Sequence, residues 1–287
     1  MEVRFYDDIN IFYDMASPFL MEHEVENGLL FYVLHALKEN INRYGVELPS
    51  LSLVLKNNLI NALAIRTPPR DLLLSFSNDL NYIELLVEEF AKRNENLPGV
   101  IGLKEAADKF TNLWCKVNNL SFKLLRKERL YKLEKVTTGT LGERRISVAN
   151  KHFQSLVLKW SKDMMSEALE EVTEIELNQS LKNISDEIES GKSRIYLLFD
   201  NNEPVSMARK AGRTPNGIAV NLVYTPLTLR RNGYATECVA KLSHQLLEEG
   251  NKYCFLFTDL SNPISNSIYQ KIGYRPIYDL NHYKFIL

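Results

Sequence analysis

The spacing of apolar and polar positions along the chain predicts most of its elements. Residues 4–45 carry apolar clusters broken by charge, which predicts helix ending near Gly45. Residues 58–66 and 71–76 predict two strands, with a turn signal of threonine and two prolines between them. The rest of the first half predicts a helix over 81–93, a short strand over 99–103, a helix over 104–117, and one long strand or a strand pair over 121–136.

The best linker candidate is TTGTLGER, residues 137–144, because it contains two glycines and three threonines. The pattern then restarts with a strand over 145–148, helices over 152–169 and 176–190, strands over 193–199, 204–210 and 218–225, a helix over 233–249, a strand over 253–260, a helix over 263–272, and one or two strands over 274–287. This order indicates an α+β or mixed α/β fold and not the strict alternation of a doubly wound sheet. We therefore expect two domains, one α+β domain over residues 1–136 and a second over residues 145–287.

Composition narrows the class of protein. A chain of 287 residues suits one large domain or two modest ones. Its 35 basic and 36 acidic residues leave a net charge of −1, which argues against broad nucleic-acid binding. Three widely spaced cysteines form no CxxC pair, and the five histidines show no HExxH spacing, so we expect no metal site. The start MEVRFYDD is not typical of a signal peptide, and no apolar run reaches the roughly 20 residues of a membrane span. We expect a cytoplasmic protein with reduced thiols and no membrane partner.

The first stretch that carries candidate chemistry is the turn between the strand ending at Thr225 and the helix beginning near Gly233. A helix start presents free N–H groups, and a glycine there lets an anion approach the backbone closely. Arg230 and Arg231 add positive charge for phosphate oxygens. On these residues alone, an ordinary strand-to-helix turn with solvated arginines explains the pattern equally well.

The second stretch, from Asn262 to Tyr274, reads N-P-I-S-N-S-I-Y-Q-K-I-G-Y. Asn262 is a natural N-cap and Pro263 a natural first helical residue. Tyr269 lies one position beyond the apolar face of this short helix. It is therefore either an aromatic at the edge of the core or a phenol placed to donate a proton.

Together the two stretches resemble the GNAT superfamily of N-acetyltransferases. Arg230-x-x-Gly233-x-Ala235 resembles that family's acetyl-CoA signature, with alanine in the last position where glycine is common. Asn262 followed by Tyr269 and then Lys-Ile-Gly-Tyr resembles its second motif. The resemblance covers roughly the last half of the chain and implies a GNAT-type fold there.

The resemblance also implies roles for residues. The strands ending at Thr225 and Leu260 would splay apart, so that the pantetheine arm of acetyl-CoA runs between them against backbone groups of Val223, Tyr224 and Thr225. One of those N–H groups would stabilise the oxyanion of the reacting thioester. The cofactor's pyrophosphate would be held by Arg230, Arg231, Asn232, Gly233, Tyr234 and Ala235. Asn262 would contact the arm, and Tyr269 would protonate the departing CoA thiolate as a general acid.

The general base is not evident, because Asp200, Glu203 and Glu237 have no compelling positions. The expected activity is acetyl transfer directly to an amine of a small molecule or peptide, by a monomer or homodimer. The alternative is a non-catalytic acyl-CoA sensor or interaction protein. The first half is either a degenerate copy of the same fold or an unrelated α+β cap. The first half lacks glycine between Gly45 and Gly99, so we do not expect it to bind CoA. We expect it to form one wall of the acceptor site.

Overall fold

The computed structural model describes residues 1–168 and 174–286, and these form two compact units. The first unit comprises residues 1–130, 257–262 and 276–287, and the second comprises residues 131–256 and 263–275. The unit boundaries interrupt three strands, so the second half of the chain contributes segments to the first unit. Each unit is described by itself below.

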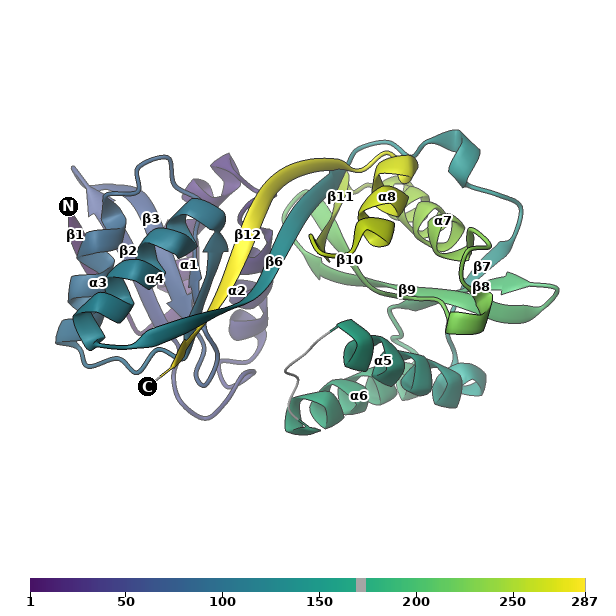
Figure 1. Ribbon diagram of the computed structural model, residues 1–287, viewed down its shortest axis with the longest axis horizontal. Helices are drawn as coiled ribbons and strands as arrows, with labels where there is room; N and C mark the ends of the chain where they lie inside the picture. Colours follow the sequence, from purple (N-terminus) through teal and green to yellow (C-terminus); the bar gives the residue numbers. More distant parts are fainter. Residues whose placement is uncertain (169–173, 287) are drawn as a thin grey trace. The chain divides into compact units, whose positions relative to one another are not determined.

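The first unit is a sheet with helices on both faces (Figure 1). Its helices are α1 (Ile9–Glu22), α2 (Gly28–Glu39), α3 (Tyr82–Lys92) and α4 (Lys104–Asn118). Its strands are β1 (Glu2–Tyr6), β2 (Ser50–Lys56), β3 (Leu59–Arg66), β4 (Leu72–Leu74), β5 (Gly99–Leu103), most of β6 (Ser121–Leu133) and most of β12 (Arg275–Ile286).

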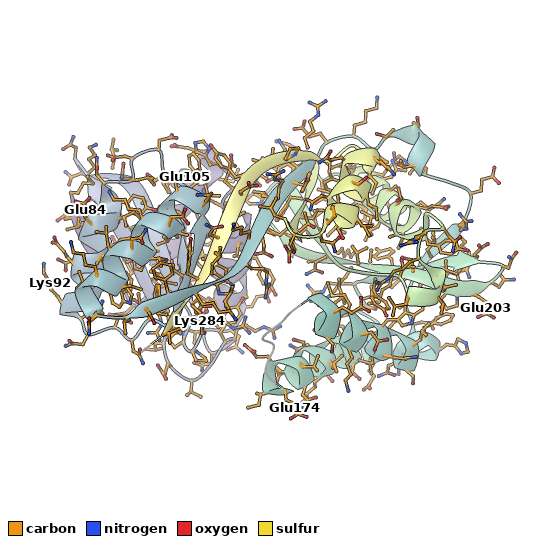
Figure 2. All side chains as sticks on the ribbon, in the orientation of Figure 1. Glu84, Lys92, Glu105, Glu174, Glu203 and Lys284 are labelled. Atoms are coloured by element: carbon orange, nitrogen blue, oxygen red, sulfur yellow. The ribbon has the colours of Figure 1, made fainter. Side chains whose placement is uncertain are left out.

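The sheet of the first unit follows the order β1-β2-β3-β4-β5-β12-β6. From β1 to β12 the neighbours are antiparallel except β4 and β5, which pair in parallel. One apolar cluster lies between the sheet and α3 and α4, around the buried Trp114 and Phe90. A second lies between the sheet and α1 and α2, around Phe12 and Phe31. Charged side chains such as Glu84 and Glu105 point outward from α3 and α4 (Figure 2).

The second unit repeats this layering, with one pair of helices on each face of its sheet (Figure 1). Its sheet order is β11-β10-β9-β8-β7. The strands are β7 (Arg145–Val148), β8 (Ile195–Asp200), β9 (Glu203–Arg213), β10 (Gly217–Tyr224) and the first residues of β11 (Tyr253–Asp259). The helices are α5 (Gln154–Ala168) and α6 (Glu174–Glu189) on one face, and α7 (Tyr234–Glu248) and α8 (Pro263–Ile272) on the other. Single turns of 3₁₀ helix are η1 (Thr138–Thr140), η2 (Lys151–Phe153) and η3 (Leu227–Leu229).

The two halves of the chain have the same element order. In each half a strand is followed by two helices, three strands, a helix, a strand, a helix and a closing strand. A two-residue Asn-Asn turn with positive φ at both positions joins the second and third strands in both halves, at Asn57-Asn58 and at Asn201-Asn202. Such φ values are those of the type I′ hairpin, which asparagine tolerates.

The α+β prediction is confirmed, and the long single strand over 121–136 is observed as β6. The continuous helix predicted over residues 4–45 is wrong. Residues 2–6 form strand β1, and the first helix, α1, begins only at Ile9. Its start is set by Asp8, whose carboxylate accepts the N–H groups of Asn10 and Ile11 at 2.7 and 3.2 Å. Strand β2 was not predicted, because its mostly buried run SLSLVLK lacks clear alternation. The predicted ends at Leu169 and Leu287 lie outside the described residues.

None of the helices in the described ranges is long and apolar enough to cross a bilayer. Residues 1–168 and 174–286 hold no group of three histidine, cysteine or acidic side chains placed to bind a metal ion.

Candidate functional site

Strands β10 and β11 are neighbours in the second unit. Their parallel pairing covers Gly217–Ala219 and Tyr253–Phe255, although β10 continues to Tyr224. The pairing of β10 with β9 also shifts register between Asn221 and Tyr224, where Leu222 has a φ of +50°. A bulge leaves backbone groups out of the ladder and bends the strand. The irregular end of β10 is thus the segment to which the resemblance assigns the pantetheine arm.

The end of β10 is fixed from its other side. The Ser206 hydroxyl donates to the carbonyl of Tyr224 at 3.0 Å and lies 2.9 Å from the Thr225 hydroxyl. The Nε of Arg230 donates to the carbonyl of Thr225 at 2.9 Å. These groups therefore engage the carbonyls of Tyr224 and Thr225 at the strand end.

The turn into α7 has the form of an anion site. Arg231 and Gly233 both have left-handed backbones, with φ of +68° and +78°. Gly233 is the N-cap, so no side chain accepts the free N–H groups of the first helical turn. Among the described residues, apart from Gly233, its two chain neighbours and the backbone of α7, no atom lies within 4 Å of the place where a Cβ of Gly233 would stand. This turn thus leaves room for an anion beside the backbone.

Arg230 does not point freely into solvent. Its guanidinium pairs with the Glu167 carboxylate of α5 at 2.6 Å and lies 5.7 Å from the ring centre of Tyr224. The Arg230 and Glu167 side chains are 40% and 41% exposed. Pairs this exposed contribute about 1 kcal/mol or less, so a phosphate can displace the carboxylate.

Tyr224 faces α5 and brings acidic and aromatic groups to the strand end. Its ring lies 6.2 Å from that of Trp160. Burial, together with the carboxylates of Glu167 and Asp163, raises the pKa of Tyr224. No local pattern in the sequence predicts this contact, because α5 and β10 lie far apart along the chain.

Tyr269 lies on α8, in the same apolar cluster as Val220 of β10 and Leu256 of β11. It is 8% exposed, and its ring lies between those of Tyr131 and Tyr274, with centres 6.2 and 5.9 Å away. Burial raises the pKa of Tyr269 to about 12. A phenol with this pKa keeps its proton throughout the neutral range.

Asn262 is the exception among the predicted site residues. It belongs to the first unit, whereas Val223 to Thr225, Arg230 to Ala235 and Tyr269 belong to the second. It directly precedes α8, and its N–H donates to the carbonyl of Asp259 at 3.1 Å.

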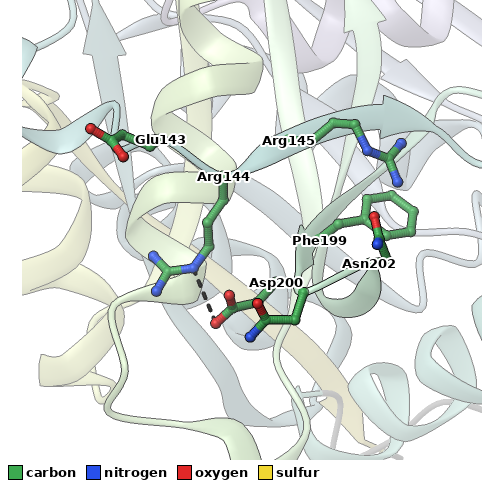
Figure 3. Close-up of a pocket in the computed structure, with 7 residues that line it drawn as sticks. Glu143, Arg144, Arg145, Phe199, Asp200 and Asn202 are labelled. Carbon is green, nitrogen blue, oxygen red and sulfur yellow. Dashed lines mark ion pairs between the residues drawn. The ribbon is translucent and has the colours of Figure 1, made fainter.

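Two of the considered bases are engaged elsewhere. Arg144 donates to both carboxylate oxygens of the buried Glu237, and its Nε lies 3.3 Å from a carboxylate oxygen of Asp200. Asp200 also accepts the hydroxyl of Tyr234 at 2.7 Å. Arg144 and Asp200 line an open depression of about 560 Å³. Figure 3 shows the ion pair between them. Arg144 belongs to the predicted linker, and no motif in the sequence marked it.

Comparison with known proteins finds one family model that matches part of the chain. Residues 198–285 match the model of the FR47-like protein family. No curated protein matches the chain.

Several solved structures are similar over most of the chain. A GNAT-family acetyltransferase from Colwellia psychrerythraea is 10% identical with a TM-score of 0.59, over 99% of this chain and 100% of that one. A Drosophila protein is 9% identical with a TM-score of 0.63, over 99% and 98%. A GCN5-related N-acetyltransferase from Sphaerobacter thermophilus is 12% identical with a TM-score of 0.58, over 88% and 84%.

Identities this low show the fold alone. The resemblance seen in the two motifs is thereby confirmed at the level of the fold, and this chain has the fold of the GNAT superfamily.

Proposed function

We propose that this chain is an acetyl-CoA-dependent N-acetyltransferase that transfers the acetyl group directly to an amine of a small molecule or peptide. One observation carries the proposal. Strand β10 runs past its parallel pairing with β11 into an irregular end, which leads to a helix start without a side-chain cap that follows Arg230 and Arg231. Few ligands combine an extended polar arm with a diphosphate, and acetyl-CoA is one of them.

The described residues fit such a ligand. The N–H groups at the start of α7 and the two guanidinium groups suit a pyrophosphate. The left-handed backbone of Gly233 and the open space beside it give the phosphates room. The bulged end of β10, from Val223 to Thr225, offers backbone groups to an amide-containing arm in the manner of an added strand. When bound, acetyl-CoA supplies the acetyl thioester.

Tyr269 acts as the general acid in this proposal. The acceptor nitrogen forms a bond to the acetyl carbon, the carbon–sulfur bond breaks, and the Tyr269 proton passes to the sulfur. The phenolate regains a proton from solvent, and the amine releases its surplus proton to solvent. With a pKa of about 12, Tyr269 enters every turnover protonated. Asp200 and Glu237 do not serve as the base, because Arg144 already pairs with both.

We further infer that the first half is a copy of the same fold that no longer takes a CoA. The repeated element order and the two Asn-Asn hairpins support a common plan. At the start of α3, the carboxylate of Asp79 accepts the N–H of Asn81 at 3.0 Å and pairs with Lys56 at 2.7 Å. The acidic Asp79 thus lies two residues before the N-cap of α3, where α7 has the basic Arg231.

The backbone at the strand end before α3 is also engaged by side chains of the first unit. The side chain of Asn27 accepts the N–H of Phe76 at 2.9 Å and donates to the carbonyl of Leu20. The ring of His23 stacks on that of Phe76 at 3.9 Å between centres. No open backbone edge remains there for a pantetheine arm among these residues.

The test has two readouts on the full chain. Acetyl-CoA should raise the melting temperature, because a ligand of the native state stabilises it. A panel of amines (polyamines, aminoglycosides and peptide N-termini) should then show release of free CoA with at least one member.

The two readouts separate the hypotheses. A raised melting temperature without CoA release on any amine would favour the acyl-CoA sensor. An unchanged melting temperature at millimolar acetyl-CoA would contradict both the enzyme and the sensor.

A further inference from the structure

The segment between the two halves contacts the helix that starts at the proposed pyrophosphate turn. The backbone N–H of Arg144 donates to one Glu237 oxygen at 2.8 Å, and its guanidinium donates to the other at 2.6 Å. Glu237 is 5% exposed and lies in the first turn of α7. A Cβ on Gly142 would stand 2.2 Å from the carboxyl carbon of Glu237, so a glycine is needed for this approach.

The same guanidinium reaches the first residue of α7. It lies 4.8 Å from the ring centre of Tyr234, and its Nε is 3.3 Å from the carboxylate of Asp200. The hydroxyl of Tyr234 donates to that carboxylate at 2.7 Å. Arg144 therefore contacts α7 at two points, through Glu237 and through the Asp200–Tyr234 pair (Figure 3 shows the Asp200 contact).

The turn needs external support because its own sequence supplies little. Its N-cap is a glycine without a capping side chain, and Arg231 adopts a left-handed backbone that costs a non-glycine residue about 1 kcal/mol or more. The Asn232 amide bonds back to the carbonyl of Leu229 at 3.1 Å, but that contact lies before the helix start. Tyr234 is the first helical residue, so its side chain fixes the place where the N–H groups begin.

We propose that Arg144 is a positioning residue for the acetyl-CoA site, holding the first turn of α7 in its binding geometry through Glu237 and the Asp200–Tyr234 hydrogen bond. The inference rests on the proposed function, because the turn must bind the pyrophosphate. Arg144 touches no reacting atom. Its effect is to keep the N–H groups aimed before the ligand arrives, which lowers the ordering cost of binding.

A purely structural role for Arg144 would be to neutralise buried Glu237. Tyr234→Phe separates the two roles, because it removes one hydroxyl and leaves the Arg144–Glu237 pair intact. Arg144→Gln removes the contacts of the side chain with both Glu237 and Asp200. Arg144→Lys keeps the positive charge but loses the planar guanidinium that reaches the two carboxylates. Arg145→Gln is the matched control, since the Arg145 guanidinium lies over Phe199 at 3.9 Å and lines the same depression.

We expect Tyr234→Phe and Arg144→Gln to raise the KM and Kd of acetyl-CoA about tenfold, the lower end of the effect of losing a hydrogen bond to a charged group. The kcat and the KM of the amine should stay within about twofold, because chemistry and acceptor binding do not use the turn. Arg144→Lys should recover part of the loss, and Arg145→Gln should behave as wild type. The variant with both Arg144→Gln and Tyr234→Phe should bind acetyl-CoA no more weakly than Arg144→Gln, because both substitutions act through the shared contact at Asp200.

Melting temperatures without ligand are measured alongside, so that a poorly folded Arg144→Gln leaves the Tyr234→Phe comparison valid. Wild-type affinity for acetyl-CoA in Tyr234→Phe would overturn the inference and leave the proposed function standing. Equal losses in Arg145→Gln would overturn it as well. If the wild-type chain binds no acetyl-CoA, the proposed function fails, and the inference fails with it.

Discussion

At the scale of single residues, the burial of Tyr269 is the feature that connects structure with mechanism. A buried phenol with a pKa of about 12 is a poor base but a stable carrier of one proton. Its place in one cluster with Val220 and Leu256 puts it beside β10 and β11. The interpretation of Tyr269 as a mere core-edge aromatic accounts for this burial too, so substitution must decide.

We predict that Tyr269→Phe lowers kcat at least about tenfold while the Kd of acetyl-CoA changes by less than about twofold, as removal of a positioned acid should. Steady-state kinetics and calorimetry check it. Tyr283→Phe is the control, because Tyr283 is 9% exposed against 8% for Tyr269 but lies in the first unit. If both variants lose activity equally, the loss reflects packing and not proton transfer.

The pairing of Arg230 with Glu167 gives a second residue-scale prediction. Glu167→Gln removes the carboxylate that competes with phosphate for the guanidinium. The Kd of acetyl-CoA should fall by up to about fivefold at low salt, with the gain shrinking as salt rises.

Calorimetry at two salt concentrations measures this change. Glu174→Gln, which removes another exposed carboxylate, controls for overall charge. Weaker binding in Glu167→Gln would show that the ion pair supports the site and does not compete with the ligand.

At the scale of elements, Asn27 links the start of α2 to the end of α1 and to the segment after β4. Its side chain is 1% exposed and satisfies the N–H of Phe76 and the carbonyl of Leu20. Asn27→Ala should lower the free energy of unfolding by about 2–3 kcal/mol, because two backbone groups lose their buried partner.

Urea denaturation measures this cost. Asn112→Ala is the matched control, since its amide bonds only to the Asp108 carbonyl on the exposed side of α4. A cost for Asn27→Ala no larger than that of Asn112→Ala would contradict this account of how the first unit is closed.

The elements that the sequence predicted well have a local cause. Strand β5 and helix α8 have the predicted bounds, because Gly99 and the Asn-Pro pair at 262–263 mark their starts within a few residues. The N-terminal errors are also local in origin, since β1 has only five residues, too few for its charged–apolar alternation to stand out before a helix. What no local pattern could provide is pairing between distant segments.

The same distinction between local patterns and distant contacts applies to the candidate site. The turn around Gly233 and the position of Tyr269 followed from short motifs. Glu167 and Arg144 did not, because their partners Arg230 and Glu237 lie 63 and 93 residues away. Only folding brings these charges together.

At the scale of the whole molecule, buried tyrosine and cysteine side chains of the second unit make the free energy of unfolding depend on pH. Burial raises the pKa of Tyr269, Cys238 and Cys254 to about 12, and that of Tyr274 well above its ordinary value. The folded pKa values exceed the unfolded ones, so the folded state holds these protons more tightly. Their contribution is complete below the unfolded values near 9 and 10 and falls as pH rises toward 12.

We therefore predict that the urea midpoint is lower at about pH 10.5 than at about pH 8. Equilibrium unfolding at the two pH values checks it. Cys254→Ala should reduce the pH dependence, because one raised pKa is removed. A midpoint that stays level or rises across this range would contradict the assignment of these groups as buried and neutral.

The repeated plan of the two halves gives the molecule two comparable helix starts that differ in charge. The start of α7 has a glycine N-cap preceded by Arg230 and Arg231. The start of α3 has Asp79 two residues before its N-cap, and Asn27 holds the backbone of the segment after β4. The central claim is that the start of α7 binds acetyl-CoA and that the chain delivers its acetyl group to an amine.

The most direct measurement is release of free CoA from acetyl-CoA by the full chain across an amine panel, with Tyr269→Phe run in parallel. The account predicts amine-dependent CoA release that falls at least about tenfold in Tyr269→Phe. Absence of release with every amine, or equal release by wild type and Tyr269→Phe, would contradict it.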